Sequence, residues 1–193
     1  IGPQTKQEVL ALVLPALAPI ERMLAMPPNT GGISEADRAA VMAQLGEAVA
    51  KYGSLPFGRE ALVDVGYKIA EMGKKASEQE RWRLALVCVD AFDILQMESL
   101  TVSRLGDRAK TMMEQPTVRV RGFMEDQQTR SLYVFLELVN RKTGAVEKAQ
   151  IREGEEIDGI RLIKVIGRNQ KVRVEYLKIP GLIFDVDFEP NNR

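Results

Sequence analysis

The sequence predicts an α+β protein in two segregated parts, an N-terminal all-α helical bundle followed by a small antiparallel β-barrel or sandwich. Three observations predict this class. Apolar residues recur at helical spacing as far as Gln115, and they alternate at strand spacing from Thr117 onward. Pro116 stands between these two patterns, where it ends a helix and favours an extended chain. We therefore expect a helical domain over residues 1–115 and an all-β domain over residues 117–193.

The N-terminal part divides into five helical segments. The first covers about residues 5–26 and is expected to bend at its prolines. The second starts after Ser34, whose hydroxyl suits an N-cap, and acidic residues follow in its first turn. Ser77, with Glu80 three residues later, predicts a capping box at the start of the fourth helix. The short turns between segments favour an antiparallel bundle or a pair of stacked hairpins.

Apolar stripes indicate which side of each helix faces the core. On the third helix the stripe consists of Leu62, Val65, Ile69 and Met72. On the fourth helix it consists of Trp82, Leu86, Val89 and Leu95. These two helices loosely resemble a tetratricopeptide hairpin, but no second copy follows at a period of about 34 residues. A solenoid array is therefore the less favoured architecture.

The C-terminal part contains six segments rich in Val, Ile, Tyr and Phe with turn residues between them. The predicted strands are residues 117–125, 131–140, 146–151, 159–166, 171–177 and 182–188. A Gly-Arg-Asn-Gln turn joins the fourth and fifth strands, and a Pro-Gly turn precedes the last. Six short strands in so small a domain predict a barrel or a sandwich.

Composition excludes several classes of function. The 27 basic and 27 acidic residues cancel overall, and each half is also close to neutral, with 13 basic and 15 acidic residues up to position 116. General nucleic-acid binding is therefore disfavoured, because it requires a clustered positive excess. The chain has no histidine, which removes histidine-dependent catalysis and histidine-bearing zinc sites. Its single cysteine, Cys88, lies in an apolar run and is interpreted as a core residue.

No constellation for catalysis, metal binding or cofactor binding emerges from the sequence. The acidic stretch Glu153, Glu155, Glu156 and Asp158 lacks the ligand pattern of a calcium loop, so we interpret it as a solvated turn. Gly154, Ile157 and Gly159 are interpreted as the structural residues of that turn. We therefore expect a non-enzymatic protein without a cofactor or a small-molecule substrate.

The second predicted strand carries the candidate binding residues. Tyr133 and Phe135 share one of its faces, and Arg119 and Arg121 lie on the preceding strand. One interpretation is a surface that binds a protein partner. The alternative is a stacking platform for single-stranded nucleic acid on an OB- or SH3-like domain. A third interpretation is an ordinary half-buried strand whose neighbouring arginines serve only to neutralise charge.

The β-domain resembles one known family over residues 117–188. The resemblance rests on a strand that ends in glycine (VRVRGFM), an apolar strand, the closing strand IFDVDF, and the spacing of Ile151, Gly154, Ile157, Gly159 and Leu162. The domain is similar to the small periplasmic β-domain of inner-membrane proteins in type IV pilus and type II secretion machines. The resemblance implies a non-enzymatic adaptor of the cell envelope that docks on the periplasmic domain of an outer-membrane channel.

The compartment follows only indirectly from the sequence. The longest apolar run is interrupted by prolines and falls short of the roughly 20 residues that cross a bilayer. Membrane attachment is therefore expected only through an anchor upstream of Ile1. The resemblance favours a periplasmic or envelope-associated protein, and a cytoplasmic protein is the alternative.

Overall fold

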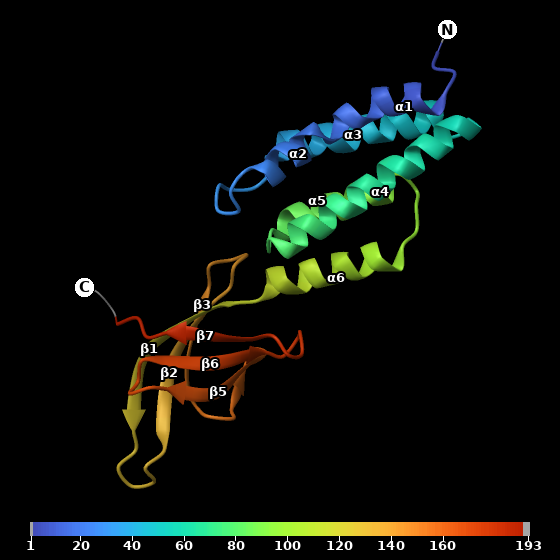
Figure 1. Ribbon diagram of the computed structural model, residues 1–193. Coiled ribbons are helices and arrows are strands. Elements are labelled where there is room, and N and C mark those ends of the chain that lie inside the picture. Colours follow the sequence, from blue (N-terminus) through green and yellow to red (C-terminus); the bar gives the residue numbers. More distant parts are fainter. Residues whose placement is uncertain (1, 191–193) are drawn as a thin grey trace. The chain divides into compact units, whose positions relative to one another are not determined.

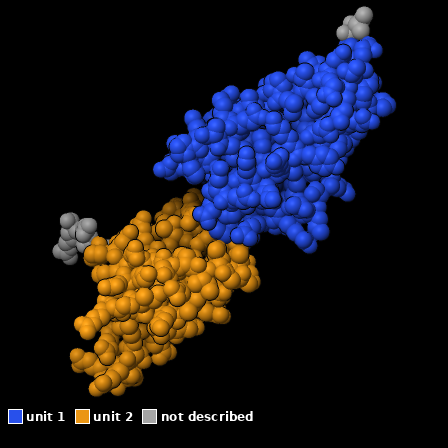
Figure 2. Space-filling model, in the orientation of Figure 1, with its two compact units in different colours: residues 1–112 blue, residues 113–193 orange. Residues whose placement is uncertain are grey.

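The computed structural model describes residues 2–190, in which helices are followed by strands (Figure 1). The chain divides into two compact units, residues 1–112 and residues 113–193, shown in separate colours in Figure 2. Each unit has its own cluster of buried apolar residues. The predicted α+β class with segregated helical and β parts is confirmed.

Within the described residues the N-terminal half contains five helical segments, and the first is broken into three short helices. The elements are α1 (Lys6–Val13), η1 (Leu14–Leu17, a 3-10 helix), α2 (Ala18–Ala25), α3 (Glu35–Tyr52), α4 (Pro56–Glu78), α5 (Trp82–Ile94) and α6 (Leu100–Glu114). Pro15 lies in the first turn of η1 and Pro19 in the first turn of α2. A proline is tolerated there because the first backbone N–H groups of a helix have no partner within it. The first predicted helix is therefore interrupted at its prolines by a 3-10 segment.

The C-terminal unit is a sandwich of two antiparallel sheets. Its strands are β1 (Thr117–Glu125), β2 (Leu132–Val139), β3 (Val146–Arg152), β4 (Glu156–Ile157), β5 (Ile160–Ile166), β6 (Lys171–Tyr176) and β7 (Ile183–Asp187). Sheet A has the order β1-β2-β3, and sheet B has the order β4-β5-β6-β7. One core receives Val134 and Leu136 from sheet A and Leu162 and Val174 from sheet B. The sheets do not close into a barrel, so the sandwich is the predicted architecture that forms.

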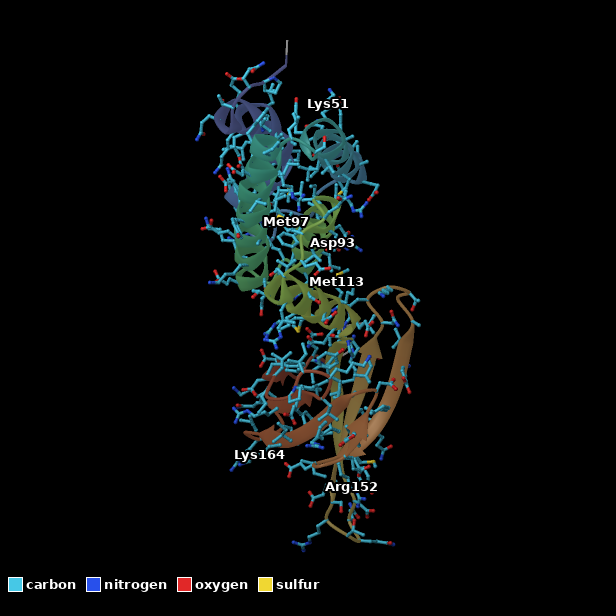
Figure 3. The ribbon with its side chains drawn as sticks, turned by 90° about the vertical axis from the view of Figure 1, so that its right-hand side faces the viewer. Lys51, Asp93, Met97, Met113, Arg152 and Lys164 are labelled. Atoms are coloured by element: carbon cyan, nitrogen blue, oxygen red, sulfur yellow. The ribbon has the colours of Figure 1, made fainter. Side chains whose placement is uncertain are left out.

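Strand β3 is an edge strand of sheet A. It pairs with β2 on one side, and no strand pairs with its other side in the described residues. In Figure 3, β3 follows the right-hand border of the β unit and ends at the labelled Arg152. At the opposite edge, β1 meets the end of sheet B through a bridge between Val120 and Phe188. Among the described residues, the β1 edge of sheet A is therefore covered and the β3 edge is not.

Strand β4 was not predicted. It pairs with β5 through a two-residue turn in which Asp158 and Gly159 have φ angles of 46° and 77°. Two successive positive φ angles are the mark of a type I′ hairpin, for which Asp-Gly is a preferred sequence. Gly154 has a φ of 86°, and Ile157 is partly buried against the core. Gly154 and Gly159 thus both adopt left-handed backbone conformations, and a short hairpin lies within the predicted turn.

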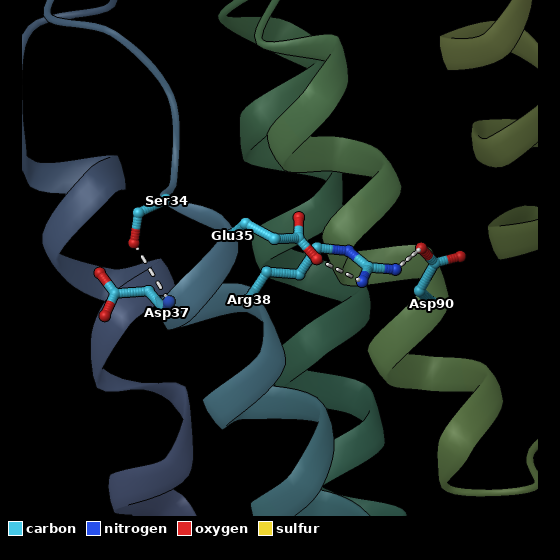
Figure 4. A network of polar contacts seen from close by, with 5 residues as sticks. All are labelled: Ser34, Glu35, Asp37, Arg38 and Asp90. Carbon is cyan, nitrogen blue, oxygen red and sulfur yellow. Dashed lines mark hydrogen bonds and ion pairs between the residues drawn. The ribbon is translucent and has the colours of Figure 1, made fainter.

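Two predicted helix starts have different outcomes. Ser34 caps α3 as predicted, because its Oγ accepts a hydrogen bond from the backbone N–H of Asp37 at 3.1 Å (Figure 4). The predicted capping box at Ser77 is wrong, because Ser77 lies in the last turn of α4. There the chain ends α4 with a left-handed residue, Glu80, whose φ is 58°. The N–H of Arg81 then donates back into α4, the pattern of a Schellman motif.

The predicted inner face of α5 is only partly confirmed. Leu95, just after the helix, is fully buried, whereas Trp82, Leu86 and Val89 are half-buried and pack against the core from its margin. The core side of α5 consists instead of Leu84, Ala85, Val87, Cys88, Ala91 and Phe92. Because α5 is apolar around most of its circumference, periodicity alone does not select one face. The other side of α5 packs near α6, where Val89 meets Gly106 and Trp82 lies under Arg108.

Candidate functional site

The outer face of sheet A brings the predicted binding residues together. Strand β2 alternates, so Val134, Leu136 and Leu138 enter the core while Tyr133 and Phe135 lie on the opposite side. The register places Arg119 opposite Glu137, and Glu137 opposite Lys148 of β3. We define the outer face by Arg119, Arg121, Tyr133, Phe135, Glu137, Lys148, Gln150 and Arg152.

Phe135 lies against a glycine of the neighbouring strand. A Cβ added to Gly122 would stand 3.4 Å from Cδ2 of Phe135, so the ring covers backbone that a side chain would otherwise cover. This contact explains why Phe135 is only half-exposed on a face that points away from the core. Gly122 directly follows the β-bulge at Arg121, which shifts the register between Val120 and Gly122.

Arg121 is engaged within the β unit. Its Nε lies 3.1 Å from Oε2 of Glu137, and the two side chains are only 20% and 16% exposed. Its Nη1 donates to the backbone oxygen of Glu189 at 3.3 Å. The N–H of Glu189 in turn donates to the carbonyl of Val120. Arg121 therefore fastens the chain end after β7 to sheet A, whereas Arg119 is exposed and makes no ion pair with any residue from 2 to 190.

Tyr133 lies beneath a second arginine. The guanidinium carbon of Arg152 is 5.7 Å from the centre of the Tyr133 ring, within the range of a cation–π contact. The Nε of Arg152 also lies 2.6 Å from Oε1 of Glu155. The hydrogen bond from Arg152 lowers the pKa of the Glu155 carboxyl. Tyr133 and Arg152 thus form a local pair at one end of the outer face.

The free edge of β3 is a feature that the sequence did not reveal. The N–H of Asn140 donates to the carbonyl of Ala145 at 2.9 Å, so these two residues form a hydrogen-bonded pair. In an antiparallel ladder such pairs occur at every second position. The register therefore assigns the bonds with β2 to Glu147, Ala149 and Ile151 of β3.

The intervening residues of β3 direct their backbone groups away from β2. These residues are Val146, Lys148, Gln150 and Arg152. The loop after β3 provides partners for the backbone of Arg152. Its N–H donates to Oε1 of Glu155, and its carbonyl accepts from the N–H of Glu155. We define the β3 edge as Val146, Lys148 and Gln150, whose outward N–H and C=O groups have no partner in the described part of the chain.

A shallow hollow lies on the outer face beside the β3 edge. It has a volume of about 390 Å³. Its lining consists of Arg121, Phe135, Leu136, Glu137, Lys148, Ala149 and Gln150. Lys148 is exposed and makes no ion pair with a described residue. The hollow thus combines an aromatic wall, an unpaired cation and an adjacent row of unpaired backbone groups.

The acidic loop serves the fold. Oε1 of Glu153 accepts the N–H of Val165 at 2.9 Å, and Oε1 of Glu156 lies 2.7 Å from Nη2 of Arg161. Together with the pair between Glu155 and Arg152, these contacts tie the loop to its neighbouring strands. The interpretation as a solvated turn is therefore incomplete, because three of the acids bond to the fold. Within residues 2–190 no group of three or more metal-ligating side chains could hold an ion.

Cys88 is a core residue, as predicted. Its side chain is 1% exposed, and burial raises the pKa of its thiol to about 12. A thiol of this kind is a poor nucleophile at neutral pH because the thiolate is the reactive form.

In the part of the chain that the structure describes, no helix is both long enough and apolar enough to span a bilayer.

No protein-family model, curated protein or solved structure matches the chain.

Proposed function

We propose that the chain is a non-catalytic docking module that binds a protein partner through sheet A. The observation that carries the proposal is the β3 edge, where three alternate residues present backbone donors and acceptors that no described residue pairs. An exposed edge of this kind is a template for an added strand, which is a common way to bind an extended peptide. The aromatic residues Tyr133 and Phe135 on the adjoining outer face supply further contact area.

Binding rather than catalysis is supported by the chemistry of the side chains. The chain has no histidine, and Cys88 is buried with a raised thiol pKa. The polar groups of the outer face are four cations, an amide, the phenol of Tyr133 and one carboxylate, Glu137, which is bonded to Arg121. These groups donate and accept hydrogen bonds and contact π faces, but they do not form a nucleophile paired with a base.

The resemblance of residues 117–188 to the periplasmic β-domain of pilus and secretion proteins suggests a specific form of this proposal. In that form the protein is an adaptor in the periplasm or cell envelope, and its partner is an outer-membrane channel or another subunit of the machine. A scaffold in the cytoplasm is the other form. In both, the helical unit offers a second contact surface.

A second candidate function is binding of single-stranded nucleic acid. The observation that favours it is the shared face of Tyr133, Phe135 and the exposed Arg119. Tyr176 of β6 adds no ring to this face, because it is 1% exposed and belongs to the core. Arg121 is held by Glu137. The cations and rings available for a strand of nucleic acid are therefore fewer than the sequence suggests.

Site-specific photocrosslinking tests the docking proposal. A photoreactive amino acid at Gln150 or at Tyr133 should form an adduct with the same protein in extracts of the source cells. The matched control places it at Arg168, an exposed residue in the turn between β5 and β6. Adducts that form equally at Arg168, or at none of the three positions, would overturn the proposal.

Fluorescence anisotropy with labelled oligonucleotides separates the two candidates. We expect weak binding of the full chain to single-stranded DNA and RNA. Tight binding that falls steeply between low and moderate salt and is lost in Arg119→Ala would support the nucleic-acid function instead.

A further inference from the structure

We propose that the β3 edge binds an extended acidic peptide segment whose carboxylates lie on the outer face of sheet A, beside Lys148. This inference rests on the proposed function, because it names the chemistry of the partner that docks there. Three features of the β unit carry it: the spacing of the free backbone groups, the unequal charge of the two faces beside β3, and the placement of a lysine at the centre of the edge.

The backbone spacing selects an extended strand. Val146, Lys148 and Gln150 stand at alternate positions, so their free N–H and C=O groups repeat at about 6.6 Å along the edge. An extended peptide has the same repeat, whereas successive turns of an α-helix have no free backbone groups to match it. An occupant about five residues long would pair with all three edge residues.

The outer face beside β3 favours acidic side chains. Lys148 lies next to the hollow and has no ion-pair partner among residues 2–190, and Arg119 lies in the same cross-strand row. Glu137, the carboxylate between them, is bonded to Arg121. A carboxylate carried by an added strand would stand opposite Lys148 and compensate its charge.

The inner side of β3 disfavours acids at the alternate positions. Glu147 points to that side, and its carboxyl forms a hydrogen bond with the carboxyl of Asp158. An acid on the inner side of an added strand would approach two carboxyls that already contact each other. The two faces therefore select a pattern, with acidic residues at every second position and neutral residues between them.

A second copy of this chain fits the edge less well. If two β3 edges paired antiparallel about Lys148, the two copies of Lys148 would stand opposite each other. If they paired about Glu147, the two copies of Glu147 would stand opposite each other, and like charges in such positions repel. Pairing centred on Ala149 sets Lys148 against Gln150 and leaves both lysines uncompensated. A lysine in the middle of an edge strand is a known obstacle to edge-to-edge association.

The test uses the full chain and two labelled peptides of about nine residues, which is enough to cover β3. In the first peptide glutamates alternate with threonines. The second has the same composition with its glutamates in one block, so that it cannot place every acid on one face. We expect the alternating peptide to bind at least about fivefold more tightly by fluorescence anisotropy. Amide NMR shifts should concentrate at Val146, Lys148 and Gln150.

Three variants test the parts of the proposal separately. Lys148→Glu should weaken the alternating peptide at least about fivefold, because it reverses the charge beside the carboxylates. Gln150→Pro should abolish binding, because it removes an outward N–H without removing a bond to β2. Gln150→Ala, the matched control, keeps that N–H and should bind like the wild type. Circular dichroism melts check that each variant folds. If the proline variant unfolds, Lys148→Glu still tests the proposal, because it changes only an exposed side chain.

Several results would overturn the inference. Equal binding of the two peptides, an unaffected Lys148→Glu variant, or an oligonucleotide that shifts the same amides would each contradict it. A dimer in analytical ultracentrifugation that Gln150→Pro converts to a monomer would identify a second copy as the occupant. If neither peptide binds while the crosslink at Gln150 persists, the acidic-peptide chemistry fails and the docking function stands. If the crosslinks are absent as well, both proposals fail.

Discussion

At the scale of single residues, several positions have one contact that decides their behaviour. Cys88 is enclosed by the helical core, and Phe135 rests on the backbone of Gly122. Gly58 is packed so closely that an added Cβ would stand 2.2 Å from the carbonyl oxygen of Tyr52. Gly46 lies in α3, and a Cβ added to it would have no neighbouring atom within 4 Å outside the helix backbone. The two glycines should therefore differ in how well they tolerate a larger side chain.

Cys88 should be unreactive in the native protein. Its thiol pKa is raised from 9.0 to about 12, so at pH 8 the thiolate fraction is about a thousandfold below that of an ordinary cysteine. We expect a disulfide reagent to label the folded chain at least about a thousandfold more slowly than the chain in denaturant. Absorbance of the released thiolate measures both rates. Rapid labelling of the folded chain would contradict the buried placement.

Gly58 and Gly46 should respond to alanine in opposite directions. Gly58→Ala forces a Cβ against backbone that cannot rotate away, so we expect a loss of about 1–3 kcal/mol in the free energy of unfolding. Gly46→Ala, its control, removes backbone freedom from the unfolded chain in an open helical position and should add about 0.5–1 kcal/mol. The fluorescence of Trp82, the single tryptophan, reports denaturant unfolding of the helical unit. Equal effects of the two substitutions would contradict the packing at Gly58.

At the scale of elements, side chains distant in sequence fasten helix ends and strands. The guanidinium of Arg81, between α4 and α5, donates to the carbonyl oxygens of Met23, Met26 and Pro27, which closes the end of α2 and the start of its loop. Arg38 of α3 reaches Asp90 of α5 with a distance of 3.0 Å from Nη2 to Oδ2 (Figure 4). These contacts join residues that lie between 52 and 58 positions apart along the chain, so no local pattern predicts them.

Glu147 of β3 should destabilise the β unit at neutral pH. The hydrogen bond with Asp158 raises the pKa of the Glu147 carboxyl above its ordinary 4.5, so the folded state favours the protonated form. The resulting stabilisation is present below pH 4.5 and is lost as the pH rises through the folded pKa. We therefore expect Glu147→Gln to raise the melting temperature at pH 7 and to have little effect below pH 4.

The control for this prediction is Glu125→Gln, which changes an exposed acid at the end of β1. It should leave the melting temperature unchanged at both pH values. Differential scanning calorimetry at pH 4 and pH 7 measures all three proteins. A rise that is equal at the two pH values would show that the contact between Glu147 and Asp158 is not the cause.

The elements themselves show what local pattern can and cannot predict. Ser34 was identified as a cap because its own neighbours complete the motif, and the prolines of the first segment act through their own rings. Ser77 failed because the end of α4 depends on a left-handed Glu80 and a bond from Arg81. The two-residue strand β4 was missed because it exists only through its pairing with β5.

The candidate site was predictable in part for the same reason. Alternation along β2 was enough to place Tyr133 and Phe135 on one face. The β3 edge was not visible, because a strand is an edge only with respect to the strands beside it. The engagement of Arg121 likewise requires Glu137 and Glu189, the second of which is 68 positions away along the chain.

At the scale of the whole molecule, the chain consists of two units with separate cores. The buried residues of the helical cluster all precede those of the β cluster, which begins at Val118. The β unit buries its own apolar residues between sheets A and B, and its strands pair with one another within these sheets. A unit with its own core has what it needs to fold alone.

A fragment of residues 113–193 should therefore fold independently. We expect strand-type circular dichroism, a cooperative melt, and dispersed NMR amide signals for β1 to β7. The matched measurement uses the same fragment with Val174→Ala, a fully buried core position, which should lower its stability by about 1–3 kcal/mol. A disordered fragment would contradict the independence of the β unit.

The sequence by itself determined the class of the fold, the boundary region near Pro116, the irregularity of the first helix at its prolines and the alternation of the strands. These features depend on residues within a few positions of one another, and the period of the apolar pattern expresses them directly. Only the tertiary structure decided three features: the strands form a sandwich, α5 turns Leu84 and Cys88 inward, and Arg121 is fastened by Glu137. It also decided that the outer side of β3 and the Lys148 ammonium have no partner among residues 2–190. The physical reason is that burial, ion pairing and edge position belong to pairs of segments that folding brings together.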